Sequence, residues 1–374
     1  MNVAAKKRAV RKPAPGRKSS SGRKKINLAL QGGGAHGAFA WGVIDRLLED
    51  DRLEIDGIVG TSAGAMNAAV TAYGLAQGGP AVAREKLHEF WNRISEGAKK
   101  SPLQPSMYDR MFKPGSLDTS PGYYMMDSLS RMMSPYQLNP MNLNPLRDVL
   151  HSVVDCKVLH RQDKVKLFIC ASNVLTGKIK VFNQDNVSVE AVLASACLPF
   201  MFQAVEVDGE FYWDGGYMGN PPLYPLIYHC GSRDVLIVQL NPIRIPEVPK
   251  TAQAIMDRIN TLSFNSSLMR EMRAIQFVTR LVDEGFDDHG RLKRMLIHTI
   301  DAEEEVCSLG VSSKLNADWT FLTGLREMGR QKAEEFLSQH FDAIGERSST
   351  DIEEKFLDVP AKSAPARKSR SNTR

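Results

Sequence analysis

Long apolar segments are missing from this 374-residue chain. No run of about 18 or more apolar residues is present, which argues against a transmembrane helix. The N-terminus also lacks the apolar segment of a secretory signal peptide, so we expect a cytoplasmic protein. Cysteines are few as well: the five are widely spaced, odd in number and form no CxxC pair. This pattern predicts neither a disulfide framework nor a zinc site.

Acidic residues are absent from both ends of the chain. Residues 1–25 contain ten Lys or Arg and residues 361–374 contain five, with no Asp or Glu in either segment. Removing these fifteen positive charges from the net charge of +5 leaves −10 for residues 26–360. Because large apolar residues are also scarce there, we predict disordered basic tails at 1–25 and 351–374.

These tails have two interpretations. They solubilise the chain, or they hold it at an anionic membrane surface, where each basic residue contributes up to about 1 kcal/mol. The second interpretation predicts a protein that is peripheral to the membrane. Aromatic residues are not interleaved with the charges, so no specific binding of nucleic acid is predicted.

The rest of the chain alternates between two apolar patterns. INLALQ at 26–31 and LEIDGIVG at 53–60 have the composition of buried strands, and each precedes a glycine-containing turn and a segment of helical spacing. Two strand–turn–helix units in succession predict an α/β fold with a mainly parallel central sheet flanked by helices. Further strands are expected at 164–174, 178–183, 233–242 and 294–300, a hairpin at 206–216, and long helices at 251–286 and 317–342.

Residues 100–146 interrupt this alternation. They hold seven of the sixteen methionines together with many Pro, Tyr, Ser and Asn residues. A loop-rich segment of this length is often a lid, and methionine adapts to flexible acyl chains. The alternative is an irregular insertion whose methionines fill gaps in a local core.

Ser62 lies in GTSAG at 60–64, between a predicted strand and a small-residue helix. A GxSxG pattern arises by chance in a chain of this length about one time in ten. The context is that of a nucleophile, because a serine on a tight strand-to-helix turn with small neighbours exposes its hydroxyl. The alternative is a serine that caps the helix, with glycines for close packing.

GGGAHG at 32–37 also allows two interpretations. It fits the GxGxxG pattern of a dinucleotide site, which expects an acidic residue at the end of the second strand. Asp56 lies 24 residues after Gly32, but the predicted strand continues past it into GTSAG. The other interpretation is a loop whose backbone N–H groups stabilise an oxyanion.

No histidine has a convincing setting as the base for Ser62. His298 falls in a predicted strand and His340 in a predicted helix, whereas His289 lies in a polar loop and stays a candidate. His36, in the glycine loop, either lines the site or faces solvent. Asp214, which follows an aromatic-rich strand and precedes Gly215 and Gly216, is placed on a turn. Burial would raise the pKa of this carboxylate and make it a stronger base.

Taken in order, GGGAHG, GTSAG and the DGG at 214–216 resemble the patatin-like phospholipase family, and ASACLPFMF and NPP beside the last motif fit the same pattern. The resemblance covers roughly residues 26–227. It implies a three-layer α/β fold and a Ser–Asp dyad acting on lipid acyl esters without metal or cofactor. The roles carried over are Ser62 as nucleophile, Asp214 as proton acceptor and Gly32, Gly33 and Gly34 as the oxyanion loop, with Gly37, Gly60, Gly64, Gly215 and Gly216 as motif glycines.

One position departs from the family. Many members have Arg or Lys where this chain has His36, which leaves the charge beside the oxyanion loop, and its pH dependence, open. We expect a catalytic domain at 26–227 with 100–146 as a lid insertion, and an α/β extension at 228–350 packed on the same domain.

The sequence thus predicts a serine acyl hydrolase that forms an acyl-enzyme on Ser62 with a lipid ester substrate. Two alternatives are a non-catalytic lipid-binding module and a nucleotide-binding protein that uses the glycine loop. The lipid, the acyl position, the choice between hydrolysis and acyl transfer, the role of 251–350 and the oligomeric state are left open.

Overall fold

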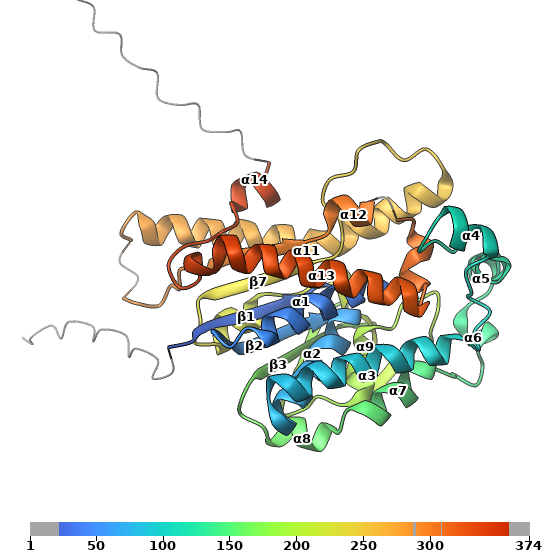
Figure 1. The fold of residues 1–374 in the computed structure, drawn as a ribbon, viewed down its shortest axis with the longest axis horizontal. Coiled ribbons are helices and arrows are strands. Elements are labelled where there is room, and N and C mark those ends of the chain that lie inside the picture. Colours follow the sequence, from blue (N-terminus) through green and yellow to red (C-terminus); the bar gives the residue numbers. More distant parts are fainter. Residues whose placement is uncertain (1–21, 287–288, 308, 359–374) are drawn as a thin grey trace, which may run out of the picture.

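A computed structural model of the chain describes residues 22–286, 289–307 and 309–358 (Figure 1). Most of both predicted tails therefore lies outside the described residues. A single sheet has the strand order β5-β6-β3-β2-β1-β7-β8, with β4 paired to β3. The strands are β1 (Lys24–Leu30), β2 (Leu53–Thr61), β3 (Lys166–Asn173), β4 (Ile179–Asn183), β5 (Val205–Val207), β6 (Glu210–Asp214), β7 (Asp234–Gln239) and β8 (Leu296–Asp301).

The middle of the sheet is parallel. Strands β3, β2, β1, β7 and β8 pair in parallel, whereas β4, β5 and β6 join antiparallel at the β3 edge. Parallel strands are buried on both faces and read as continuous apolar runs, as INLAL and VLIV do here. Because parallel strands share their carboxyl ends, the residues that follow β1, β2 and β7 meet at one edge of the sheet.

Helices cover both faces, giving three layers. Along β1, Leu28 and Leu30 belong to one core cluster while Ala29 belongs to the other, as the two-residue period of a strand requires. The first face is covered by α1 (Gly37–Glu49), α2 (Ala63–Gly78), α3 (Pro80–Ala98), α7 (Pro145–Val153), α8 (Cys156–Arg161), α9 (Val189–Ser195) and α13 (Trp319–His340). The second is covered by α10 (Tyr224–His229), α11 (Ala252–Asp283) and α14 (Ile352–Phe356). The predicted fold class is confirmed.

The region after residue 227 builds part of the same sheet. β7 pairs with β1, and β8 pairs with β7. The second neighbour of β1 in the sheet is therefore a strand that lies more than 200 residues later in the chain. Helix α13 packs closely on α1, where Gly42 and Gly329 leave no room for a Cβ atom against the facing backbone. The long segment at 251–286 forms one helix, α11, between β7 and β8.

Residues 100–146 contain three short helices: α4 (Met107–Phe112), α5 (Pro121–Met132) and α6 (Pro135–Leu138). Each follows a serine, Ser106, Ser120 or Ser134, and the last two have proline at the first helical position, a strong start signal. The three helices gather at one end of the molecule (Figure 1).

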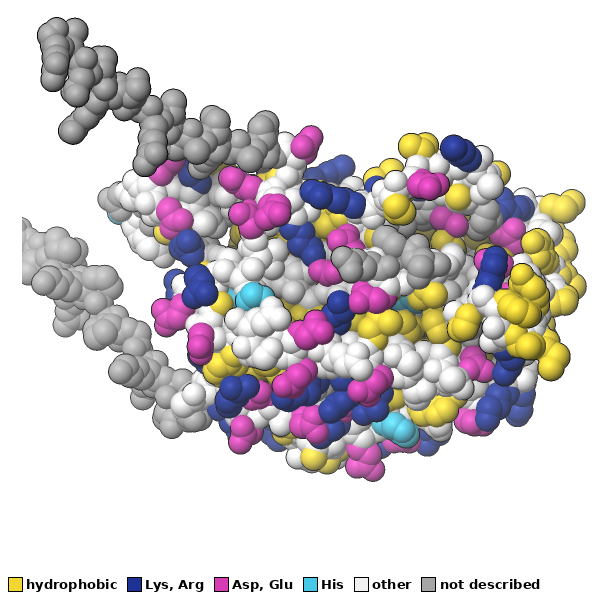
Figure 2. Space-filling view, turned by 45° about the horizontal axis from the view of Figure 1, so that its top comes forward, with side chains coloured by type: hydrophobic (Ala, Val, Ile, Leu, Met, Phe, Trp, Pro, Cys, Tyr) yellow, Lys and Arg dark blue, Asp and Glu magenta, His cyan; other side chains and the backbone are white. Residues whose placement is uncertain are grey.

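This end exposes many large apolar side chains, which we call the methionine-rich face (Figure 2). It consists of Met107, Tyr108, Met111, Phe112, Tyr124, Met125, Leu129, Met132, Met133, Tyr136, Leu138, Met141 and Leu143. These methionines do not fill a local core, because no residue of α5 is buried. A contiguous exposed apolar surface of this kind marks an interaction site.

The C-terminal boundary differs from the prediction. Residues 351–358, assigned to a disordered tail, contain helix α14, which Asp351 caps through the N–H groups of Glu353 and Glu354. Ile352 and Phe356 are buried in the second core cluster because their spacing of four residues puts both on one helix face. Similarly, Lys24 and Lys25 belong to β1 rather than to the N-terminal tail.

Candidate active site

Ser62 occupies a strained turn between β2 and α2. Its backbone has φ 56° and ψ −124°, a region that non-glycine residues rarely adopt and that costs about 1–3 kcal/mol. The residue precedes α2, yet its hydroxyl forms no capping bond, so the helix-cap interpretation does not account for this serine. Its N–H donates to Oγ of Ser195 at 2.9 Å, which fixes the turn. The hydroxyl is thereby available for other chemistry.

The glycine loop lies directly against this serine. A Cβ atom added to Gly32 would be only 2.6 Å from Cβ of Ser62, so only glycine allows the approach. Gly34 has φ +60° and packs against the carbonyl oxygen of Lys314. The remaining motif glycines, Gly37, Gly60, Gly64, Gly215 and Gly216, are also closely packed, with no space for a side chain.

The three loop glycines are not equivalent. The N–H of Gly32 donates to Oδ1 of Asn220 at 2.7 Å and is therefore occupied. Within the described part of the chain, the N–H groups of Gly33 and Gly34 have no hydrogen-bond partner. The N–H of Gly32 thus anchors the loop to Asn220.

A cluster of amide side chains holds the loop in place. The carbonyl of Gly32 accepts from Nδ2 of Asn241 at 2.7 Å, and Oε1 of Gln31 accepts from the N–H of Asn241 at 2.9 Å. Nε2 of Gln31 in turn donates to the carbonyl of Asn220 at 3.1 Å. Our sequence reasoning missed these residues, although Gln31 and Asn241 are polar residues directly after buried strands, which is a usable signal.

Asp214 reaches the site from the antiparallel edge. It pairs with Ala171 of β3, and the neighbouring Cys170 pairs with Thr61 of β2, which precedes Ser62. The Oδ1 atom accepts from the N–H of Gly216 at 2.7 Å, and the Asp214 carbonyl accepts from Oγ of Ser172 at 2.8 Å. These bonds fix the carboxylate on the 3-10 turn Gly215–Tyr217.

The environment of Asp214 suits a base. Burial raises the pKa of Asp214 to about 7, although the N–H of Gly216, the Ser62 hydroxyl and the charge of Lys314 each act to lower it. Its Oδ2 atom is buried and has no partner of ordinary hydrogen-bond geometry among the described residues. The Ser62 hydroxyl is therefore near enough to affect the carboxylate without a bond of ordinary geometry, and such bonds often tighten only when substrate binds.

The four histidines considered as bases either lie away from Ser62 or are uncharged at neutral pH. His298 is buried on β8 between Asp234 and Ser349, and His340 ends α13. His289 lies before β8, at the amino ends of the parallel strands, whereas Ser62 follows the carboxyl end of β2. His36 is buried beside the loop with Nε2 2.7 Å from Oγ of Ser313, and burial lowers its pKa to about 3. It carries no charge at neutral pH.

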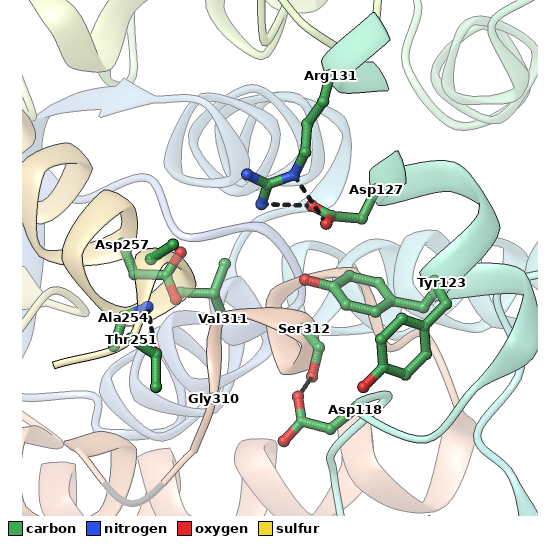
Figure 3. A pocket seen from close by; sticks show the side chains of 12 residues that line it. Asp118, Tyr123, Asp127, Arg131, Thr251, Ala254, Asp257, Gly310, Val311 and Ser312 are labelled. Atoms are coloured by element: carbon green, nitrogen blue, oxygen red, sulfur yellow. Dashed lines mark hydrogen bonds and ion pairs between the residues drawn. The ribbon is translucent and has the colours of Figure 1, made fainter. Parts of the chain in front are cut away.

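Two cavities lie near this site. An apolar cavity of about 770 Å³ is lined by Met132, Met133 and Tyr136 on one side and by Trp213, Tyr217 and Met218, next to Asp214, on the other. A second cavity of about 590 Å³, lined by both charged and apolar side chains, lies between α5, the start of α11 and residues 310–312 (Figure 3). The first is bordered by residues of the methionine-rich face on one side and by residues close in sequence to Asp214 on the other.

No group of three or more His, Cys, Asp or Glu in that part of the chain is placed to hold a metal ion. None of the described helices combines the length and apolar character needed to cross a bilayer.

Several solved structures are similar to this chain. VipD from Legionella pneumophila is 15% identical with a TM-score of 0.43, and the match covers 90% of this chain and 73% of that one. ExoU in the ExoU-SpcU complex from the type III secretion system of Pseudomonas aeruginosa is 17% identical with a TM-score of 0.31. That match covers 87% of this chain and 61% of ExoU. A separate comparison with curated proteins gave no significant match.

The family assignment rests on the sequence. The family model described as patatin-like phospholipase matches residues 28–227, which is more than half of the chain and includes Ser62, Asp214 and the glycine loop. The chain belongs to the patatin-like phospholipase family.

Proposed function

We propose that the protein is a serine acyl hydrolase that cleaves carboxylic esters of lipids through Ser62 and Asp214. The observation that carries this proposal is the pairing of a strained, non-capping serine with a buried carboxylate whose pKa is close to neutral. Membership of the patatin-like phospholipase family supports the lipid class of the substrate.

In the proposed mechanism the Ser62 hydroxyl oxygen attacks the ester carbonyl carbon while Asp214 accepts its proton. The N–H groups of Gly33 and Gly34 stabilise the oxyanion, since they have no other partner in the described chain. Collapse of the intermediate breaks the bond to the leaving alcohol, which takes the proton from Asp214. Water then attacks the acyl-enzyme with Asp214 again as base, releasing the fatty acid and restoring Ser62.

The substrate is proposed to enter under the methionine-rich face. Exposed Met132 and Tyr136 of this face also line the apolar cavity that Trp213 borders, one residue before Asp214, which supports the entry of an acyl chain from this side. Methionine adapts to flexible acyl chains, and tyrosine suits the boundary between lipid and water. The basic tails are proposed to add peripheral attraction to anionic membrane, with most of their length outside the described residues.

Intact-mass labelling with a fluorophosphonate ester tests the proposal. The native protein should gain one adduct, and Ser62→Ala and Asp214→Ala should gain none while keeping the native circular-dichroism spectrum. Ser152→Ala, at an exposed serine of α7, serves as a control for labelling at another serine and should keep the adduct. Labelling of Ser62→Ala would place the nucleophile elsewhere.

Failure of the folded native protein to label, with or without vesicles, would favour the lipid-binding module. Thermal stabilisation by a dinucleotide that survives Ser62→Ala would favour the nucleotide-binding alternative.

A further inference from the structure

Lys314 reaches the candidate site from a part of the chain that the motifs do not include. It lies in the 3-10 turn Val311–Leu315, between α12 (Glu303–Cys307) and α13, well after the segment matched by the family model. Its carbonyl oxygen packs against Gly34, which has no room there for a Cβ atom. Ser313, the residue before it, bonds to His36. The turn therefore closes over the glycine loop.

The side chain of Lys314 is tied to the loop through one amide. Its Nζ atom donates to Oδ1 of Asn241 at 3.0 Å, and Nδ2 of the same amide donates to the carbonyl of Gly32 at 2.7 Å. An amide that accepts from a cation is oriented by it, because Oδ1 and Nδ2 cannot exchange places without losing both bonds. Lys314 thereby fixes the direction in which Asn241 holds Gly32.

The charge of Lys314 also acts on the carboxylate. Burial lowers the pKa of the Lys314 ammonium, while the charges of Asp257, on α11, and of Asp214 raise it. Conversely, Lys314 is the only charged side chain among the described residues that shifts the pKa of Asp214. A partly buried charge is screened less than a surface charge, so this interaction persists in salt.

The other titratable groups that interact with Asp214 are neutral near pH 7. Burial raises the pKa of Cys170 on β3, of Cys197 to about 12 and of Tyr217 to about 12. His36, which Lys314 also influences, is neutral because burial lowers its pKa to about 3. The field at the carboxylate thus depends on one lysine.

We propose that Lys314 is a positioning residue of this active site: through Asn241 it orients the oxyanion loop, and its ammonium group favours the ionised form of the Asp214 carboxylate. This inference rests on the proposed function, because it assigns a role within the same site. The proposal assigns a role in the active site to a residue of segment 251–350, for which the sequence indicated no function. Lys314 acts through Asp214 and the loop rather than by contact with the ester.

The test is the pH dependence of the fluorophosphonate labelling rate. In Lys314→Met the charge is lost, the carboxylate binds its proton more tightly, and the acid limb of the profile should move to higher pH. Below the midpoint the rate at a given pH should therefore be lower than that of the native protein. Lys314→Gln, which keeps a donor for Asn241, should move the limb by a similar amount, and Lys314→Arg should leave it at the native position.

Lys293→Met is the matched control. Lys293 is a partly buried lysine before β8 whose Nζ donates to the carbonyls of Cys230 and Ser232, and burial lowers its pKa as well. It should leave the limb unchanged. All variants are first compared with the native protein by thermal unfolding, and Lys314→Gln replaces Lys314→Met if the latter does not fold.

Two results would overturn the inference: an unmoved acid limb in a folded Lys314→Gln variant, or an equal displacement in Lys314→Arg. A merely structural role would lower the rate at every pH without displacing the limb. Failure of the proposed function looks different, since the native protein would then not label at Ser62.

Discussion

Oδ1 of Asp214 accepts a hydrogen bond from the N–H of Gly216, while Oδ2 of the same carboxylate is buried without a partner in the described chain. One oxygen is therefore held and the other is left facing the region of Ser62. In the proposed mechanism the free oxygen must be deprotonated to accept the serine proton. This relationship makes the reaction sensitive to pH in a defined direction.

The labelling rate should follow the ionisation of Asp214. Because the pKa of Asp214 is raised to about 7, the rate should reach its plateau above that pH. Below it the rate should fall about tenfold for each pH unit, as the ionised fraction does. Measuring labelling from pH 5 to 9 checks this. A midpoint near pH 4, the value of an ordinary carboxylate, would show that burial does not raise the pKa of the base.

Asp214→Asn should stabilise the fold at alkaline pH. The pKa is about 7 in the folded chain and about 3.9 in the unfolded one, so the stability tied to the protonated carboxyl is complete below pH 4 and is lost as the pH rises through 7. Asparagine cannot ionise and can keep the bond to Gly216. The gain in free energy of unfolding should be near zero at pH 4 and reach a few kcal/mol, at most about 4, at pH 8.5.

Urea titrations of the native protein and Asp214→Asn at both pH values provide the measurement. Asp283→Asn is the control, because hydrogen bonding from Arg294 lowers the pKa of Asp283 and its pH trend should be small and opposite in sign. A gain from Asp214→Asn that does not change with pH would contradict the argument.

Gly34→Ala should lower the labelling rate about a hundredfold without unfolding the chain. The substitution forces a Cβ atom against the carbonyl of Lys314 at a positive φ, so the loop must move and its donors leave the oxyanion position. Loss of one oxyanion donor costs about 2.7–4 kcal/mol of barrier lowering. Gly97→Ala, where nothing lies within 4 Å of the added Cβ, is the control and should label normally. Native labelling by folded Gly34→Ala would remove the loop from the mechanism.

The methionine-rich face should matter for lipid in vesicles but not for a small soluble probe. We expect Met111→Ser combined with Phe112→Ser, both more than 60% exposed, to lower hydrolysis of vesicle phospholipid several-fold. Their fluorophosphonate labelling rate should stay native, because neither lines the cavity beside Asp214. Tyr228→Ser, an equally exposed apolar side chain outside the face, is the control. Equal loss with both substrates would indicate a folding defect.

Local sequence patterns predicted much of the fold. The parallel strands and the long helices were predicted because their apolar residues repeat with clear periods, and the motif glycines marked the turns that carry Ser62 and Asp214. Helix α14 was missed because its sequence is short and charged, and few of its side chains, Ile352 and Phe356 among them, are buried in the core. Its stability comes from distant contacts, which composition does not report.

The supporting residues of the site were harder to predict. Asn220, Asn241 and Lys314 belong to no local pattern, and each meets the glycine loop only because the sheet brings distant segments together. Polar residues at the ends of buried strands would have been candidates for Gln31 and Asn241. Nothing around Lys314 distinguishes it from a surface lysine until the turn at 311–315 is placed over Gly34.

The position of β1 between β2 and β7 has a consequence for synthesis. Residues 26–62 emerge early from the ribosome, but β1 stays half-paired until β7 has been made, and the loop that follows it is not secured until residue 314 has emerged. A nascent chain in which Ser62 has already been synthesised therefore still lacks the later residues that hold the neighbouring glycine loop in place. The order of the elements along the chain postpones the formation of a working site until translation of the folded region is nearly finished.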